Sequence, residues 1–173
     1  MVLNFGGTTL NPGNSFNLNC GENGSMGLQS MVTIPSESND SIYNIFHKRN
    51  IYRDNADTID PNGLTYLIQD KLYRTKVNMH KDNGLGKVIE KNKVIFDNDS
   101  LTNDLVAIKH SNSKDWWLLV TSEILSNTKW RFLLQENGEL KGPFKQNIGD
   151  TINRIGNGVA HAVMSPSGSI FAY

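Results

Sequence analysis

A short pattern occurs three times in this chain: an apolar run, a polar turn, and a second run of β-branched or aromatic residues. The three copies span residues 31–46, 105–120 and 159–173. Each copy has the turn chemistry of a β-hairpin. Hairpins that recur at a long interval build a repeat array, because no single unit can bury its own apolar face. This pattern therefore constrains the architecture more than any other feature of the sequence.

Two landmarks define the repeat interval. Ile108 and Val163 lie 55 residues apart, and the turn signals Asn83-Gly84 and Asn137-Gly138 lie 54 residues apart. An interval of about 50 residues holds four strands and is close to that of kelch-type propeller blades. Because Asn-Gly pairs tolerate positive φ, both signals are predicted to be hairpin turns.

The first unit is longer than this interval. Ile34 and Ile108 lie 74 residues apart, and the excess falls within residues 47–70. We expect these residues to form an insertion outside the first sheet. The residues that disfavour a central strand there are Asp54, Asp57, Asp60, Pro61 and Gly63.

The expected fold class is all-β: an incomplete β-propeller segment of four-stranded antiparallel blades, without helix. Residues 1–26 are interpreted as the tail of a preceding blade and a loop. The first blade is expected at 27–103, the second at 104–157, and a truncated third blade at 158–173. Propellers close with about four to eight blades. We therefore expect the chain to be a fragment of a longer protein, whose remaining blades would be its partners.

Composition excludes some classes of protein. Seventeen basic and seventeen acidic residues give a formal net charge of zero, which argues against the basic surface of a nucleic-acid binder. No apolar run has the length of a membrane span. Cys20 is the single cysteine, so no intramolecular disulfide is possible and the redox compartment stays open.

Several stretches also carry a family resemblance, and they follow in order along nearly the whole chain. They are Leu10–Gly13, Cys20 with Gly24–Gln29, Ile34-Pro35, Asn39–Tyr43 with Phe46-His47, Asn83–Asn92, Ala107–His110 with Asp115–Trp117, and Ser165–Gly168. With these stretches the chain resembles the propeller-like N-terminal region of large secreted proteins that carry a type IX (por secretion) sorting domain at the C-terminus. The last stretch also looks like the Ser-Pro-Asp-Gly turn of WD40-like blades, with Ser167 where Asp is usual.

The resemblance implies an exported or cell-surface multidomain protein, usually without an assigned activity. It transfers no catalytic residue. Secretion is implied by the resemblance alone, since the first residues contain neither the basic nor the apolar region of a secretion signal.

The candidate ligand-binding residues are Trp116, Trp117, His110 and Asp115. Aromatic and polar groups on adjoining turns suit a shallow polar ligand site, and flat aromatic faces suit sugar rings. The ligand would be a protein or a carbohydrate at the cell surface. Successive strand residues point to opposite faces, so one of the two tryptophans is expected in the core. Trp130 is also expected to be a core residue.

The cofactor prediction is none, with calcium as the only candidate. Asp97, Asp99 and Asp104 supply the hard oxygen ligands that calcium prefers. They do not follow the EF-hand order, and solvated turns are the favoured explanation for them. The four histidines show no zinc-binding spacing.

The sequence contains no nucleophile elbow and no phosphate-binding loop. We therefore expect no enzyme, but a non-catalytic binding or spacer module. One alternative is part of a glycan-active hydrolase or lyase propeller, with its site at the mouth of the channel. That enzyme would need two carboxylates to converge in space. A purely structural scaffold is the second alternative.

Overall fold

The computed structural model describes residues 29–53, 66–97, 100–122, 126–151 and 162–172. These residues form β-strands and turns and contain no helix, and therefore none that could cross a membrane. The all-β prediction is confirmed. The strands are β1 Met31–Ser36, β2 Asn39–Arg53, β3 Tyr66–Asn78, β4 Lys87–Phe96, β5 Leu101–Lys109, β6 Trp116–Ser122, β7 Thr128–Leu134, β8 Leu140–Asn147, β9 Val163–Met164 and β10 Phe171–Ala172.

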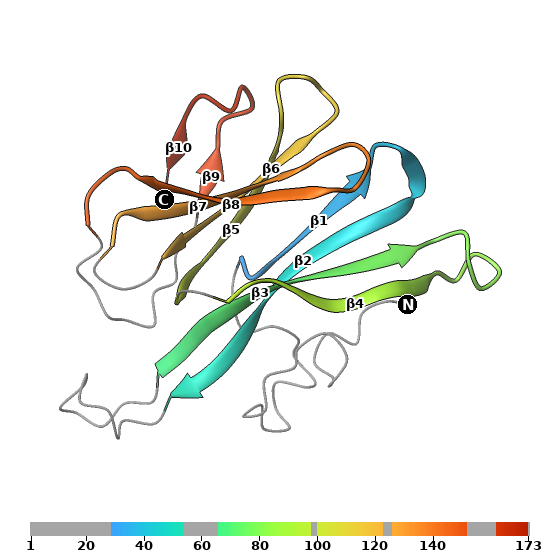
Figure 1. Cartoon of the computed structure of the whole chain (residues 1–173), viewed down its shortest axis with the longest axis horizontal. Coiled ribbons are helices and arrows are strands. Elements are labelled where there is room, and N and C mark those ends of the chain that lie inside the picture. The colour runs from blue at the N-terminus through green and yellow to red at the C-terminus, as the bar shows by residue number, and fades with distance from the viewer. Residues whose placement is uncertain (1–28, 54–65, 98–99, 123–125, 152–161, 173) are drawn as a thin grey trace.

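The first eight strands pair in chain order within two groups. Strands β1 to β4 form one antiparallel meander, called here the first meander. Strands β5 to β8 form the second meander. A bridge between Gln69 and Leu101 pairs β3 with β5 and joins both groups into one large antiparallel sheet. Figure 1 shows the second meander lying across the first, face to face.

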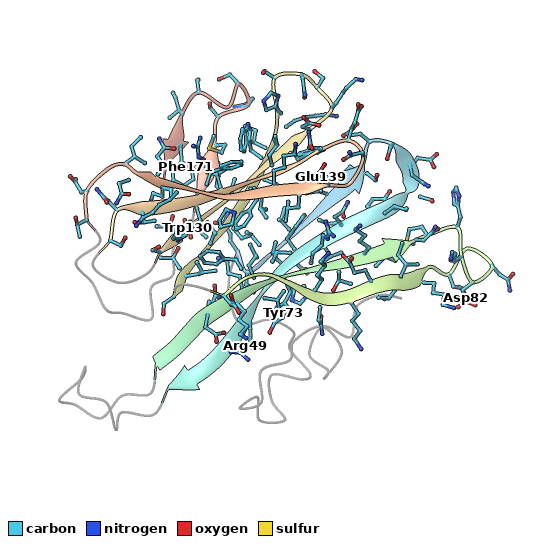
Figure 2. The ribbon with its side chains drawn as sticks, viewed as in Figure 1. Arg49, Tyr73, Asp82, Trp130, Glu139 and Phe171 are labelled. Atoms are coloured by element: carbon cyan, nitrogen blue, oxygen red, sulfur yellow. The ribbon has the colours of Figure 1, made fainter. Side chains whose placement is uncertain are left out.

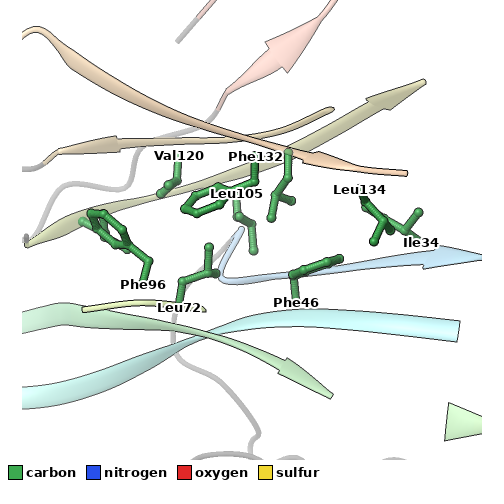
Figure 3. Close-up of a cluster of buried hydrophobic side chains, with 10 residues drawn as sticks. Ile34, Phe46, Leu72, Phe96, Leu105, Val120, Phe132 and Leu134 are labelled. Carbon is green, nitrogen blue, oxygen red and sulfur yellow. The ribbon is translucent and has the colours of Figure 1, made fainter. Parts of the chain in front are cut away.

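The hydrophobic core lies between the two meanders. Figure 3 shows side chains from both groups of strands meeting there. Successive side chains of a strand point to opposite faces, so alternate residues enter this core. On β6, Leu118 and Val120 are buried in it, while Trp117 and Leu119 point to the other face. The buried cluster consists of Ile34, Phe46, Leu72, Phe96, Leu101, Leu105, Leu118, Val120, Phe132 and Leu134. Each meander thus buries its apolar face against the other.

Both Asn-Gly signals form hairpin turns, as predicted. Asn83 and Gly84 have φ angles of 54° and 84°, and Gly138 has a φ of 83°. The Gly138 amide donates a 2.8 Å hydrogen bond to the Gln135 carbonyl. These turns set the pairing of β3 with β4 and of β7 with β8.

Residues 47–70 were predicted to lie outside the first sheet. This prediction is wrong for residues 47–53 and 66–70, which belong to strands of that sheet. Strand β2 continues to Arg53 and β3 begins at Tyr66, and the two strands pair along this whole length. The reason is composition: the Asp, Pro and Gly residues that disfavour strands lie at 54–63, outside the described residues. The flanking segments 48–53 and 66–70 are rich in Ile, Tyr and Leu, which favour strands.

The third hairpin is short. Val163 and Met164 pair with Ala172 and Phe171 across the turn at 165–168. The Ser165 amide donates to the Ile170 carbonyl at 2.8 Å, and the Gly168 amide donates to the Ser165 carbonyl at the same distance. The predicted residues 159–161 of this hairpin lie outside the described residues. A Cβ atom on Gly168 would lie 3.1 Å from the Ile108 side chain, so the turn rests against β5.

Candidate functional site

The two adjacent tryptophans point to opposite faces of the second meander, as predicted. Trp116 points toward the first meander and packs against the hydrophobic core. Its Nε1 atom donates a 2.9 Å hydrogen bond to Glu37, in the turn between β1 and β2. Lys109 bonds the same carboxylate at 2.8 Å and lies over the Trp116 ring, 5.4 Å from its centroid. Trp116 therefore links the two meanders.

Trp117 lies on the opposite face of the second meander, called here the outer face. The His110 ring lies 5.8 Å from the Trp117 ring, and the Phe144 ring lies 6.3 Å away in an edge-on arrangement. The Arg131 guanidinium lies over the Trp117 ring, 5.6 Å from the centroid. Figure 2 shows Phe171 of β10 above the second meander and Trp130 below it, which marks the two faces.

His110 and Asp115 hold the turn between β5 and β6. The His110 Nδ1 atom accepts a 3.1 Å hydrogen bond from the Asn112 amide. The Asp115 carboxylate accepts from the Asn112 side chain at 2.9 Å and from the Glu136 amide at 2.8 Å. These two bonds, first that from Asn112, hold the pKa of Asp115 below its ordinary value. Asp115 therefore serves the turn, while His110 also faces Trp117.

Sequence reasoning missed Arg131 and Phe144 as neighbours of Trp117. The two residues are cross-strand partners in the β7–β8 pairing. The turn alone does not give this pairing: next to it Leu134 lies opposite Leu140 and Leu133 opposite Lys141, and a register shift between Arg131 and Leu133 then brings Arg131 opposite Phe144. A β-bulge of this kind inserts one extra residue into one strand and is not signalled by the Asn-Gly turn.

The calcium candidates do not form a described metal site. Asp104 is buried, and its carboxylate accepts from the Thr121 amide at 3.3 Å and from the hydroxyls of Thr102 and Thr121. Asp97 is exposed, and Asp99 lies outside the described residues. Across the described parts of the chain, no group of three or more His, Cys, Asp or Glu residues could hold a metal ion.

The other aromatic prediction concerned Trp130, which packs against the core as expected. Its ring lies 5.0 Å from that of Phe96, on β4 of the first meander. Its Nε1 atom donates to Ser122 at 2.9 Å. Trp130 is thus a structural residue with its polar atom satisfied.

A buried histidine, His47, lies on the first meander. His47 stacks on Tyr73 with ring centroids 5.4 Å apart, and its Nε2 atom lies 3.4 Å from the Thr75 hydroxyl. Burial lowers the pKa of His47 from 6.5 to about 4, against a smaller opposing hydrogen bond with Asn92. His47 is therefore neutral at physiological pH and belongs to the packing of this sheet. No bound group is needed to explain it.

Comparison of the chain with models of protein families, with curated proteins and with solved structures found no match.

Proposed function

We propose that this chain is a β-propeller segment that serves as a non-catalytic binding or spacer module of an exported or cell-surface protein. One observation carries the architectural part. The first strands of successive units are neighbours: β1 contacts β5, and β5 contacts β9. Propeller blades are four-stranded sheets arranged around a central channel, so their first strands are expected to adjoin in this order.

The contacts between the meanders support the same proposal. Arg74 of β3 is 5% exposed, and its Nη1 atom donates to the Gly138 carbonyl in the β7–β8 turn at 3.2 Å. Lys48 of β2 is 1% exposed, and its Nζ atom donates to the Asp104 carbonyl of β5 at 2.7 Å. These polar bonds fix how one four-stranded unit sits on the next, as neighbouring repeats require.

Four carboxylates among the described residues support a binding module, because each is engaged in local structure. Glu90 pairs with Arg74 at 2.8 Å, and Glu136 pairs with Lys114 at 3.1 Å. Asp104 and Asp115 accept the hydrogen bonds of neighbouring strands and turns. A glycosidase needs two carboxylates that face each other across a substrate. These four instead stabilise local structure.

Secretion and the type IX sorting signal enter this proposal through the sequence resemblance alone. The proposed location is the cell surface or the extracellular medium. Fractionation of the source cells with an antibody against this chain tests it. Recovery in the cytoplasmic fraction would contradict an exported protein.

Incubation of the purified chain with a panel of polysaccharides, glycosides and esters tests the lack of catalysis. We expect no turnover above that of heat-denatured protein. Turnover that is lost on substitution of one carboxylate would establish the hydrolase or lyase alternative.

A crystal structure in which β1, β5 and β9 do not line one axis would contradict the propeller.

A further inference from the structure

We infer that Asn83 is a site of spontaneous deamidation in the folded protein, and that the fold protects the corresponding Asn137. Both residues precede a glycine, in the turns of the β3–β4 and β7–β8 hairpins. Water is the co-reactant, and ammonia is the leaving group. This chemistry is independent of the proposed binding function.

The reaction is an attack by the main chain on the preceding side chain. The Gly84 nitrogen gives up its proton to water and bonds to Cγ of Asn83, while the side-chain nitrogen takes up a proton and leaves as ammonia. Water then opens the resulting succinimide at either carbonyl, which gives aspartate or isoaspartate. No oxidant or reductant takes part. Glycine suits the attacking position because it lacks a Cβ atom and permits a close approach of the backbone.

The Asn83-Gly84 turn leaves both reacting groups accessible. Neither the Gly84 amide nor the Asn83 side chain forms a hydrogen bond with the described residues. Both residues are exposed, and Figure 2 shows the adjoining Asp82 at the far tip of the β3–β4 hairpin. Water therefore reaches the site, and no hydrogen bond has to break before the attack.

The backbone of this turn is also strained. Asp82 and Asn83 have φ angles of 55° and 54°, in the left-handed region that residues with a Cβ atom seldom adopt. Asn137 does not occupy this region. Departure from it releases strain at Asn83, so the rotation that brings Cγ to the Gly84 nitrogen costs less there.

Three hydrogen bonds hold the Asn137-Gly138 turn instead. The Gly138 amide, which would be the attacking group, donates to the Gln135 carbonyl at 2.8 Å. The Asn137 side-chain oxygen accepts from the Glu139 amide at 2.9 Å. The Gly138 carbonyl accepts from Arg74 of the first meander at 3.2 Å. Attack at Asn137 requires the first bond to break, and the other two restrain the groups on both sides of it.

Deamidation of Asn83 would alter the β3–β4 turn. Each event replaces a neutral amide with a carboxylate, in a turn bounded by Lys81 and Lys87. In isoaspartate the main chain runs through the side-chain carbon, which lengthens the turn that the Leu85 amide closes onto the Asp82 carbonyl at 2.9 Å. An aged protein would therefore carry a changed charge and a changed backbone at this tip.

Peptide mapping of the whole chain after incubation near neutral pH measures both rates at once. Trypsin cleaves after Lys81, Lys87, Arg131 and Lys141, so each asparagine lies in its own peptide. Mass spectrometry then follows the conversion of amide to carboxylate, with a sample taken before incubation as the zero point. We expect Asn83 to react about two- to tenfold faster than Asn137, because one hydrogen bond has to break at Asn137.

Incubation of the same chain in urea is the matched control. Both sites are Asn-Gly pairs, so their rates should become equal once the hydrogen bonds of the fold are lost. N83Q should abolish the mass change in its own peptide and leave the rate at Asn137 unchanged. Fragmentation that distinguishes the two products should find both aspartate and isoaspartate at position 83, since water opens the succinimide on either side.

Four results would overturn the inference. They are an unchanged Asn83 in the folded chain, equal rates of the two sites in the folded chain, the same difference between the rates in urea, and aspartate as the sole product. The third would show that the neighbouring residues in the sequence set the rates, independently of the fold. The fourth would indicate direct hydrolysis of the side-chain amide, without attack by Gly84.

Discussion

The shared core predicts how one substitution in the first meander affects the second. Phe96 lies on β4 and is 3% exposed, and its ring contacts Trp130 at 5.0 Å and Phe132 at 5.9 Å, both on β7. F96A removes a fully buried ring, which costs about 2 kcal/mol in transfer free energy. The cavity and the two lost aromatic contacts raise the total to about 3–5 kcal/mol. For a chain of this size the midpoint of thermal unfolding should fall by about 6–20 °C.

The assay can separate the two meanders. All three tryptophans lie in the second meander, on β6 and β7, whereas Phe96 lies in the first. Far-UV circular dichroism and tryptophan fluorescence should therefore report the same lowered midpoint. F144A is the matched control, because Phe144 is 41% exposed and should cost about 1 kcal/mol or less. Two separate unfolding transitions, or equal falls of the unfolding midpoint in F96A and F144A, would refute the shared core.

Three further predictions concern other contacts. The free energy of unfolding should fall by about 3 kcal/mol as pH drops from 6.5 to about 4, because His47 is neutral when folded and takes up a proton on unfolding. Denaturant titrations of the unmodified chain and of H47Q isolate the contribution of His47 to this pH dependence. H80Q, at an exposed histidine, is the control. G142A should lower the midpoint of thermal unfolding more than G138A. Both glycines have a positive φ, so both substitutions strain the backbone. A Cβ atom at Gly142 would also lie 2.8 Å from the Arg131 carbonyl oxygen, whereas one at Gly138 meets nothing within 4 Å. R74Q should cost about 1–3 kcal/mol in urea unfolding, since Arg74 bonds both Glu90 and the Gly138 carbonyl, while K93Q on exposed β4 should change little.

Local signals in the sequence predicted most strands correctly, because turns and alternation are short-range features. The Asn137-Gly138 pair located a hairpin, and alternation in β6 separated Trp116 from Trp117. Residues 47–53 were misassigned because the repeat interval grouped them with the strand-disfavouring residues at 54–63. Lys48 shows why this failed: its ammonium group finds two backbone carbonyls on β5, a long-range contact that no local pattern records. The blade boundaries stay a prediction.

The candidate site was predictable only in part for a similar reason. The sequence identified Trp117 and His110, which are close along the chain. Arg131 and Phe144 join them from β7 and β8, through strand pairing. A list of adjacent residues cannot contain such neighbours, and the register shift between Arg131 and Leu133 means that the turn alone does not locate them either.

The long β2–β3 hairpin changes how this protein could evolve or be engineered. In many repeat arrays a unit can be duplicated, deleted or exchanged, because its boundaries coincide with its contacts. Here Gln69 of the first meander pairs with Leu101 of the second, and Lys48 donates to the carbonyls of Thr102 and Asp104. A unit inserted between residues 97 and 100 would separate Lys48 from its acceptors. The two meanders are therefore expected to be inherited, and transplanted, as a single pair.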